Sequence, residues 1–346
     1  MPIFYPMKFS PVYRAKTWGG RCLTRFFNRP TPAVSPVGES AEIIDMPGMS
    51  SSVAEGPMAG MTLTELCKEY PQEIYGRQAS QYQYTGFPVV FKYINAEEAL
   101  SIQVHPDDRY AMKYENANGK FEAWYIVDAK PNARISRSFK PGVTAEKAKK
   151  AIREGRAEEV IHSYPVEKGQ SIIVPPGTIH GIGRGLIVAE VAQNSDITYR
   201  AYDYNRTPAK GEKRPLQIEK VLDVLKFQDQ NDFVKEVKLN SLCSKICLND
   251  CFSLYKYSFR EPIHDYTYNQ FRLLCNVEGH GTIISPDSLF EDIEFHPGDT
   301  ILIPACLYDF SLVPATHCVM LEVFGGKFDK NEDRKQAMIP HPQGQF

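Results

Sequence analysis

Residues that commonly bind metal ions or move protons are concentrated in three short segments. In SIQVHPDD, Gln103 and His105 are two positions apart, so on a β-strand both side chains point to one face. In GKFEAW, Lys120 and Glu122 have the same spacing. His180 follows the Pro-Gly turn of VPPGTIHGIG, and this turn would place it at the mouth of a β-barrel.

Four of these residues have the chemistry of a metal site. Two imidazoles, one carboxylate and one amide oxygen can bind a borderline divalent cation such as zinc and leave a position open for water or substrate. The predicted ligands are Gln103, His105, Glu122 and His180. A single histidine in a β protein is more often a packing or surface residue, so the prediction depends on the whole set.

Two further charged residues lie in GLIVAEVAQNSDITYRAYDYNR. Glu190 interrupts an apolar strand, and an inward carboxylate is costly unless it has a partner. Arg200 follows ten residues later, on a strand with two tyrosines. Glu190 is our candidate for a catalytic base, and a structural pair with Arg200 is the alternative. Arg200 could itself grip an anionic oxygen of a substrate or hold a carboxylate.

The composition excludes several classes of protein. A formal net charge of -2 over 346 residues gives no basic field for nucleic acid or acidic lipid. No window approaches the 18 apolar residues of a membrane span, and the N-terminal residues lack the pattern of a secretory signal. We therefore expect a cytoplasmic protein whose eight cysteines stay reduced. The evenly spaced Cys243, Cys247 and Cys251 are interpreted as packing residues, because they form no CxxC motif.

Short β-rich runs separated by Gly and Pro must position these residues. The predicted strands cover residues 88–94, 99–105, 122–129, 171–177, 185–192, 197–204, 251–259, 271–277, 299–305 and 317–324. Many short strands with such turns indicate a sandwich or barrel. Helices are predicted at 62–76, at 144–162 with Thr144 as the N-cap, and at 216–227. The polar stretch QDQNDF, residues 228–233, marks a candidate domain boundary.

The chain contains an internal repeat. Residues 169–180, GQSIIVPPGTIH, share a Gly, an apolar run and a Pro with residues 298–309, GDTILIPACLYD. His180 in the first copy corresponds to Asp309 in the second. The two copies begin at residues 169 and 298, and a repeat with this separation predicts two homologous β-barrel domains in tandem.

Together these segments resemble type I phosphomannose isomerases, in particular their short bacterial form. The matching stretches are KTWGG (16–20), GESAEI (38–43), LSIQVHPDD (100–108), GKFEAWYIVDAKP (119–131), GQSIIVPPGTIHGIG (169–183) and QNSDITYRAYDYNR (193–206). Residues 169–180 are also similar to the second cupin motif. One departure is Ala41, where relatives often carry Trp, which bears on local packing and not on the metal site.

The resemblance implies a function and a set of roles. The family interconverts mannose 6-phosphate and fructose 6-phosphate through an enediol. Its zinc ligands fall on Gln103, His105, Glu122 and His180, and its active-site lysine, glutamate and arginine fall on Lys120, Glu190 and Arg200. We expect one zinc ion per chain and a small sugar phosphate as the partner, with neither nucleic acid nor membrane. The oligomeric state is left open.

The implied architecture is mainly β, with two tandem cupin (double-stranded β-helix, or jelly-roll) barrels and a small helical insertion at 144–162. Residues 1–235 would form the catalytic, metal-binding domain. Residues 236–346 would form a degenerate cupin and a polar tail. The barrel of this domain, residues from about 236 to 325, should bind no metal, because none of its histidines, His264, His280, His296 and His317, repeats the Gln103–His105 spacing.

Two other functions stay open at this point. A cupin dioxygenase would use a similar ligand set with iron, but Gln103 and the Lys120–Arg200 pair favour a redox-inert metal and an anionic substrate. A non-catalytic sugar-binding cupin would not need Lys120, Glu122 and Glu190 together with a complete ligand set. Metal analysis with an oxygen-consumption assay and a coupled isomerase assay discriminate these alternatives.

Overall fold

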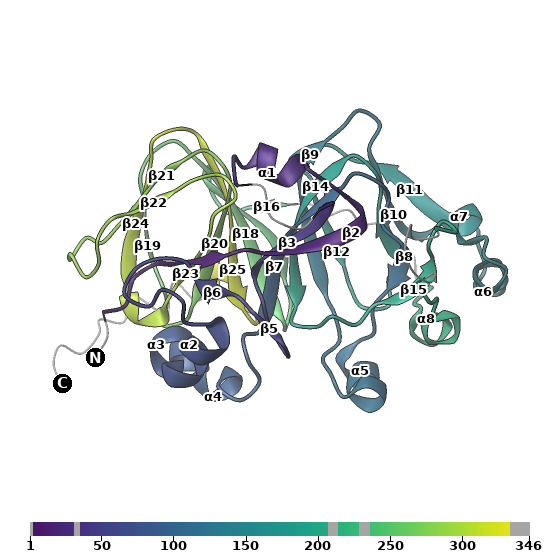
Figure 1. The fold of residues 1–346 in the computed structure, drawn as a ribbon, viewed down its shortest axis with the longest axis horizontal. Coiled ribbons are helices and arrows are strands. Elements are labelled where there is room, and N and C mark those ends of the chain that lie inside the picture. The colour runs from purple at the N-terminus through teal and green to yellow at the C-terminus, as the bar shows by residue number, and fades with distance from the viewer. Residues whose placement is uncertain (1–2, 31–34, 207–213, 228–235, 333–346) are drawn as a thin grey trace. The chain divides into compact units, whose positions relative to one another are not determined.

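The structure, a computed structural model, describes residues 3–30, 35–206, 214–227 and 236–332. Strands predominate, as predicted (Figure 1). The chain divides into two compact units. We call residues Pro11–Met46 and Val89–Lys235 the central unit, and residues Met1–Ser10, Pro47–Pro88 and Glu236–Phe346 the C-terminal unit.

The central unit contains two antiparallel sheets. The six-stranded sheet has the order β12-β9-β14-β7-β3-β2 and the five-stranded sheet the order β11-β10-β13-β8-β15. The strands of the unit are β2 (Val12–Gly20), β3 (Val37–Ile43), β4 (Asp45–Met46), β7 (Val89–Ala96), β8 (Ile102–Val104), β9 (Glu122–Ala129), β10 (Arg134–Phe139), β11 (Ile161–Pro165), β12 (Ser171–Val174), β13 (His180–Ile182), β14 (Leu186–Gln193) and β15 (Tyr199–Tyr202).

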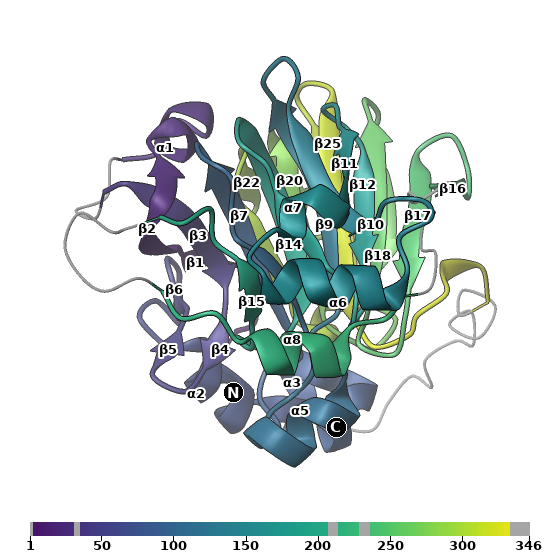
Figure 2. The same ribbon diagram turned by 90° about the vertical axis from the view of Figure 1, so that its right-hand side faces the viewer.

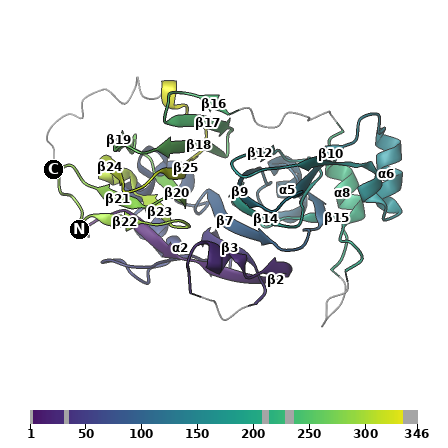
Figure 3. The ribbon, with the colours of Figure 1, turned by 90° about the horizontal axis from the view of Figure 1, so that it is seen from above.

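Both sheets contribute alternate side chains to one apolar core. Ile126 and Val188 of the six-stranded sheet pack in the same buried cluster as Ile135 and Ile182 of the five-stranded sheet. Because side chains alternate across a strand, every second residue of β9 and β14 faces this core. Figure 3 labels strands of both sheets, among them β9, β12 and β14 of the six-stranded sheet and β10 and β15 of the five-stranded sheet.

The helices of the central unit are α1 (Cys22–Phe26), α5 (Asp108–Glu115), α6 (Ala145–Arg153), α7 (Ala157–Val160) and α8 (Ile218–Val224). The buried sides of α6, α7 and α8 pack in a second cluster with residues of β8 and β15 (Figure 2). Thr144 caps α6, as predicted, by accepting a hydrogen bond from the Lys147 amide. The predicted helix 144–162 is nevertheless two helices, because Gly155 adopts a left-handed φ of 69° and residues 161–162 already belong to β11. The sequence did not predict α5.

The C-terminal unit also contains two antiparallel sheets, in the orders β16-β17-β18-β25-β20-β23-β1-β6 and β19-β24-β21-β22. Its strands are β1 (Met7–Ser10), β5 (Met49–Ser50), β6 (Ser52–Val53), β16 (Val237–Lys238), β17 (Cys243–Leu248), β18 (Phe252–Phe259), β19 (Ile263–Tyr266), β20 (Arg272–Glu278), β21 (Gly281–Ile284), β22 (Ile293–Phe295), β23 (Thr300–Ile303), β24 (Asp309–Pro314) and β25 (Cys318–Gly325). Its helices are α2 (Leu63–Glu69), α3 (Pro71–Tyr75), α4 (Ala79–Tyr82) and the 3₁₀ turns η1 (Gly76–Gln78) and η2 (Ala305–Leu307).

This division differs from the contiguous domains that we predicted, since two N-terminal segments belong to the C-terminal unit. Strand β1 pairs with β23, through Met7 opposite Leu302. The predicted helix 62–76 is α2, capped by Thr62, followed by α3. Its Tyr75 ring lies 6.1 Å from Phe271, and Phe87 lies 4.6 Å from the same ring. The predicted boundary at 228–233 lies outside the described residues.

The strand registers extend the internal repeat. In the central unit, Glu122 on β9 lies opposite Val174 on β12, and in the C-terminal unit Arg272 on β20 lies opposite Ile303 on β23. Val174 and Ile303 end the matching apolar runs SIIV and TILI. Arg272 therefore takes the position of Glu122.

Glu190 also has a counterpart. It lies opposite Trp124, two residues after Glu122, and Glu322 on β25 lies opposite Leu274, two residues after Arg272. The C-terminal unit thus keeps the carboxylate on its returning strand and replaces the other carboxylate by a guanidinium.

A buried ion cluster occupies this part of the C-terminal unit. The side chains of Asp265, Arg272, Glu322 and Lys330 are each at most 2% exposed. An Arg272 Nη2 lies 2.9 Å from Asp265 and also contacts Glu322. Lys330 Nζ lies 3.1 Å from Asp265 and 2.5 Å from Glu322. Two cations thus balance two carboxylates, the arrangement that burial of charge requires.

The histidines of this unit make other contacts. His264 and His317 lie within hydrogen-bonding distance of serine side chains. The rings of His280 and His296 stack with centroids 6.2 Å apart, a proximity that the sequence did not predict. Among the described helices, none has the length and apolar character needed to cross a membrane.

Replacing Lys330 by Met should remove one cation from two buried carboxylates and lower the free energy of unfolding by about 3 kcal/mol. Burial lowers the pKa of Lys330 to about 7 despite Asp265, so urea unfolding should be measured at pH 6, where the ammonium is charged. Lys327→Met is the matched control, because Lys327 is exposed on the same segment. Adding Glu322→Gln to Lys330→Met should recover part of the loss. Equal stabilities of the two single variants would contradict the prediction.

Candidate metal centre and active site

A row of cross-strand partners gathers polar side chains on the five-stranded sheet. Arg137, His180, Gln103 and Arg200 are successive partners on β10, β13, β8 and β15. Directly opposite residues share a face of an antiparallel sheet. His105 follows the end of β8 by one residue. The register therefore brings together three of the predicted ligands, from segments far apart in sequence, and adds Arg200.

The six-stranded sheet supplies the carboxylates. On β14, Glu190 lies between Lys92 on β7 and Trp124 on β9. Glu122, two residues before Trp124, lies opposite Ala192. Glu122 and Glu190 are an even number of residues from Ile126 and Val188 on the same strands. Their side chains therefore point to the same face, towards the core between the two sheets.

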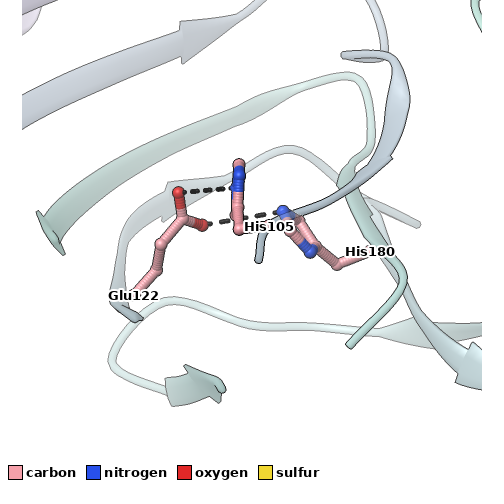
Figure 4. A group of neighbouring side chains, drawn as sticks. All are labelled: His105, Glu122 and His180. Carbon is pink, nitrogen blue, oxygen red and sulfur yellow. Dashed lines mark ion pairs between the residues drawn. The ribbon is translucent and has the colours of Figure 1, made fainter. Parts of the chain in front are cut away.

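The three predicted ligands that bear imidazole or carboxylate groups converge (Figure 4). The ligand atoms of His105, Glu122 and His180 all lie within 4.8 Å of one another, and all three residues are buried. His105 Nε2 lies 3.1 Å from Glu122 Oε1, and His180 Nε2 lies 3.6 Å from Glu122 Oε2. In the described part of the chain, this is the one group of at least three His, Cys, Asp or Glu side chains so arranged.

Backbone carbonyls orient both imidazoles. His105 Nδ1 lies 2.7 Å from the carbonyl of Ile197, and His180 Nδ1 lies 2.9 Å from that of Thr178. A carbonyl can only accept, so each Nδ1 carries the proton and each Nε2 presents a lone pair to Glu122. His105 Nε2 is buried without a hydrogen bond, and Glu122 Oε1, which lies 2.8 Å from the Lys120 ammonium, also faces it. Lone pairs that face one another call for a cation between them, so these residues fit a metal ion.

His180 and Glu122 have the ionisation states that metal ligands require. Burial and the neighbouring His105 lower the pKa of His180 to about 3, so its imidazole is neutral at physiological pH. Burial alone would raise the pKa of Glu122, but Lys120, His105 and His180 outweigh it and hold that pKa well below its usual range. A neutral imidazole and an ionised carboxylate are the forms that bind metals.

Gln103 lies at the edge of this group. Its Nε2 is 3.4 Å from His180 Nε2, and its Oε1 accepts a hydrogen bond from Ser101. Coordination through the amide oxygen would require the terminal amide to turn over, which exchanges two atoms of similar size.

Known proteins share this arrangement of sequence and fold. A sequence model described as phosphomannose isomerase type I, catalytic domain, matches residues 7–136. The probable mannose-6-phosphate isomerase GmuF of Bacillus subtilis is 34% identical over 313 residues, which cover 89% of this chain and 96% of that protein. The chain belongs to the type I phosphomannose isomerase family.

Two further relatives support the assignment. Mannose-6-phosphate isomerase ManA of Bacillus subtilis is 32% identical over 321 residues, covering 91% of this chain and 98% of that protein. The crystal structure of the mannose 6-phosphate isomerase from Bacillus subtilis superposes with a TM-score of 0.83 at 29% identity, covering 92% of this chain and 99% of that one. The predicted family and the predicted cupin fold are confirmed. This metal-dependent family accounts for a buried His-Glu-His group.

In this type I isomerase, Glu190 pairs with lysines. Lys92 Nζ lies 2.9 Å and Lys120 Nζ 3.9 Å from Glu190 Oε1. Lys120 also lies 2.8 Å from Glu122 Oε1. The alternative that we considered, a structural Glu190–Arg200 pair, is therefore replaced by a Glu190–Lys92 pair, because these residues are direct partners on β14 and β7.

The sequence analysis missed Lys92 and Glu39. Burial alone would lower the pKa of Lys92, but Glu190 and Glu39 raise it above its usual value, so the buried ammonium stays charged. Glu39 in turn lies 3.3 Å from Lys16. A lone lysine in the apolar run PVVFKYI was the available signal for Lys92, by the reasoning already applied to Glu190.

A recess adjoins these charges. Arg14, Glu39, Lys92, Lys120 and Glu190 line it. Ala41 lines it too, opposite Lys92 in the register of β3 and β7.

Three arginines lie near the end of β15. Asp203 binds the guanidinium groups of Arg206 and Arg214, in each case within 2.5 Å. Burial and the charge of Arg214 lower the pKa of the half-buried Arg200. Asp203 and Asp196 both attract Arg200, so three arginines and two carboxylates lie near the end of β15. The sequence analysis had identified only Arg200 among the three arginines.

The acid stability of the protein should depend on Glu39. Burial alone would raise the pKa of Glu39, but Lys92, Lys16 and Arg14 together hold it at about 2, against 4.5 unfolded. A lowered folded pKa gives stability that is complete above pH 4.5 and lost as the pH falls towards 2, amounting to about 3 kcal/mol. In urea unfolding, the wild type should lose about that much more than Glu39→Gln across this range. The exposed Glu98, changed to Gln, serves as the control. Equal acid losses in wild type and Glu39→Gln would refute the prediction.

Proposed function

We propose that this chain is a mannose-6-phosphate isomerase that interconverts mannose 6-phosphate and fructose 6-phosphate through an enediol, with one zinc ion held by Gln103, His105, Glu122 and His180. The observation that carries the proposal is the convergence of two oriented lone pairs and a buried carboxylate beside Glu190 and Lys120. The family membership and the names of the relatives agree with it.

The ligand set suits zinc. Nitrogen and carboxylate ligands with an open position are typical of catalytic zinc sites. A bound divalent cation would act as a Lewis acid that polarises the sugar carbonyl and stabilises negative charge at the substrate oxygens. No electron transfer is needed to move a proton between C1 and C2, which favours a redox-inert metal over the iron of a dioxygenase.

Glu190 is the proposed base that carries the proton between the two carbons. Its Oε1 forms ion pairs with Lys92 and Lys120, and the side chain is only 4% exposed. Exclusion of bulk water slows the loss of this proton to solvent without preventing it. Lys120, which lies between Glu122 and Glu190, is the proposed proton donor to a substrate oxygen and the second candidate for the base.

Arg200 is the proposed contact for an anionic oxygen of the substrate. It shares its row with Gln103 and His180, and its Nε is buried without a hydrogen bond. Arg206 and Arg214 add positive charge nearby. Parallel assays of an Arg200→Lys variant with a sugar phosphate and with a free aldose separate phosphate binding from stabilisation of the enediolate.

We further propose that the C-terminal unit binds no metal. Its counterpart of Glu122 is Arg272, whose guanidinium already balances Asp265 and Glu322. Within the described residues, its histidines do not form a group with carboxylates like that of the central unit.

All eight cysteines are free thiols, which supports a reducing compartment and hence the cytoplasm.

Loss of a ligand should remove metal and activity together. His180→Ala deletes one oriented lone pair, and we expect zinc content, measured by atomic emission, and mannose 6-phosphate isomerase activity, measured in a coupled assay, to fall in proportion. His264→Ala removes an exposed histidine of the C-terminal unit and should change neither quantity. Full activity of chelator-treated, metal-free protein would reject the metal, and no activity of zinc-loaded wild type would reject the function.

Loss of the proposed base should lower activity without loss of the metal. Glu190→Gln keeps the shape of the side chain but cannot accept the proton, so kcat should fall roughly 100-fold or more while bound zinc is retained. Exchange of the C2 hydrogen with deuterated solvent, followed by NMR, should slow to the same extent. Exchange at the wild-type rate would show that another group is the base.

A further inference from the structure

The indole of Trp124 contacts two of the three converging residues. Trp124 lies on β9, two residues after Glu122, and is 1% exposed. Its Nε1–H donates a hydrogen bond to Glu122 Oε2 at 3.1 Å. Its ring and the His180 ring form an edge-to-face contact with centroids 5.5 Å apart. One side chain therefore touches both the carboxylate and an imidazole of the proposed site.

The two oxygens of Glu122 have different surroundings. Oε1 lies 2.8 Å from Lys120 and 3.1 Å from His105. Oε2 lies 3.6 Å from His180 and receives the indole hydrogen bond. The close contact of Lys120 is with Oε1, so without a donor at Oε2 the carboxylate can rotate towards the ammonium.

A neutral donor suits this place. A second ammonium at Oε2 would neutralise the charge that a metal ion needs, whereas an indole N–H satisfies a lone pair and leaves the negative charge intact. The indole also packs with Ile126, Ile172 and Val188, which fixes its own orientation. A rigid donor on the strand of the ligand can therefore fix the rotamer of that ligand.

We propose that Trp124 is a positioning residue that holds the Glu122 carboxylate in its metal-binding orientation. This inference rests on the proposed metal site, but it assigns a separate task, since Trp124 itself supplies no ligand atom. Hydrogen bonds to ligating groups commonly change metal affinity by roughly 10- to 100-fold. The role is thus measurable in the affinity for Zn²⁺ alone, without any substrate.

The chain contains a matched control. Trp18, the other of its two tryptophans, is 3% exposed and packs in the same apolar cluster as Trp124. Trp18→Phe and Trp124→Phe each replace a buried indole by a smaller ring, so their losses of core packing should be similar. Trp124→Phe alone also removes the donor to Glu122. The thermal midpoints of the two metal-free variants measure the shared packing loss.

The experiment is a titration of Zn²⁺ against a competing chelator. We expect Trp124→Phe to bind Zn²⁺ about 10- to 100-fold more weakly than wild type, and Trp18→Phe to stay within about twofold of wild type. In Trp18→Phe, the remaining indole is Trp124, so Zn²⁺ should change the intrinsic fluorescence. In Trp124→Phe, this change should disappear.

Two outcomes would overturn the inference. The first is equal Zn²⁺ affinity in the two variants. The second is an intrinsic fluorescence of Trp18→Phe that does not change when Zn²⁺ is added. This fluorescence measurement tests the inference even if Trp124→Phe does not fold. Failure of wild-type protein to bind Zn²⁺ would instead reject the proposed metal site, so the two failures are distinguishable.

Discussion

The burial of the Glu122 carboxylate is the interaction on which the central unit depends. An isolated carboxylate within a β core costs several kcal/mol, so it persists only with partners of matching charge and geometry. Here the four partners come from three segments of the chain: Lys120 and Trp124 lie two residues either side of it, and His105 and His180 come from the end of β8 and from β13. A slip of one residue in β9 would turn Glu122 to the opposite face and leave the two lone pairs without it. The strand register therefore determines both the stability of the fold and the chemistry of the site.

The two units meet the same constraint in different ways. In the central unit, oriented imidazoles face the carboxylate and leave room for an external cation. In the C-terminal unit, the equivalent strand position carries Arg272, and Lys330 supplies a second cation from beyond β25. The cations are thus built into the chain, and no metal is needed to balance Asp265 and Glu322. The guanidinium in place of a carboxylate, Asp309 in place of His180 and the added Lys330 together make this difference.

The sequence predicted most of what depends on local spacing. The two-residue spacings of Gln103–His105 and Lys120–Glu122, with the turn before His180, predicted residues that the structure brings together. It could not predict which buried ions pair, because Glu190 and Lys92 meet only through the register of β14 and β7. Trp124 was overlooked for a similar reason: an aromatic residue in an apolar strand gives no sign that its N–H reaches a carboxylate. The inclusion of residues 47–88 in the C-terminal unit follows from aromatic contacts with Phe271, which are distant in sequence.

The surroundings of Glu190 follow from the same register. Both lysines approach the same oxygen, Oε1, so the positive charge lies on one side of this carboxylate. These two ion pairs offset the cost of burying the Glu190 carboxylate. The neighbours of Glu190 are ammonium groups, which do not accept the proton that Glu190 takes from the substrate. Glu190 can therefore return this proton to the adjacent carbon, as the proposed reaction requires. Glu39 attracts Lys92 and forms ion pairs with the partly exposed Lys16 and Arg14, so a series of charged side chains leads from the metal ligands to the recess. Because each ion in this series depends on its neighbours, a change at Glu39 should reach Glu190 through Lys92 although the two carboxylates lie on different strands.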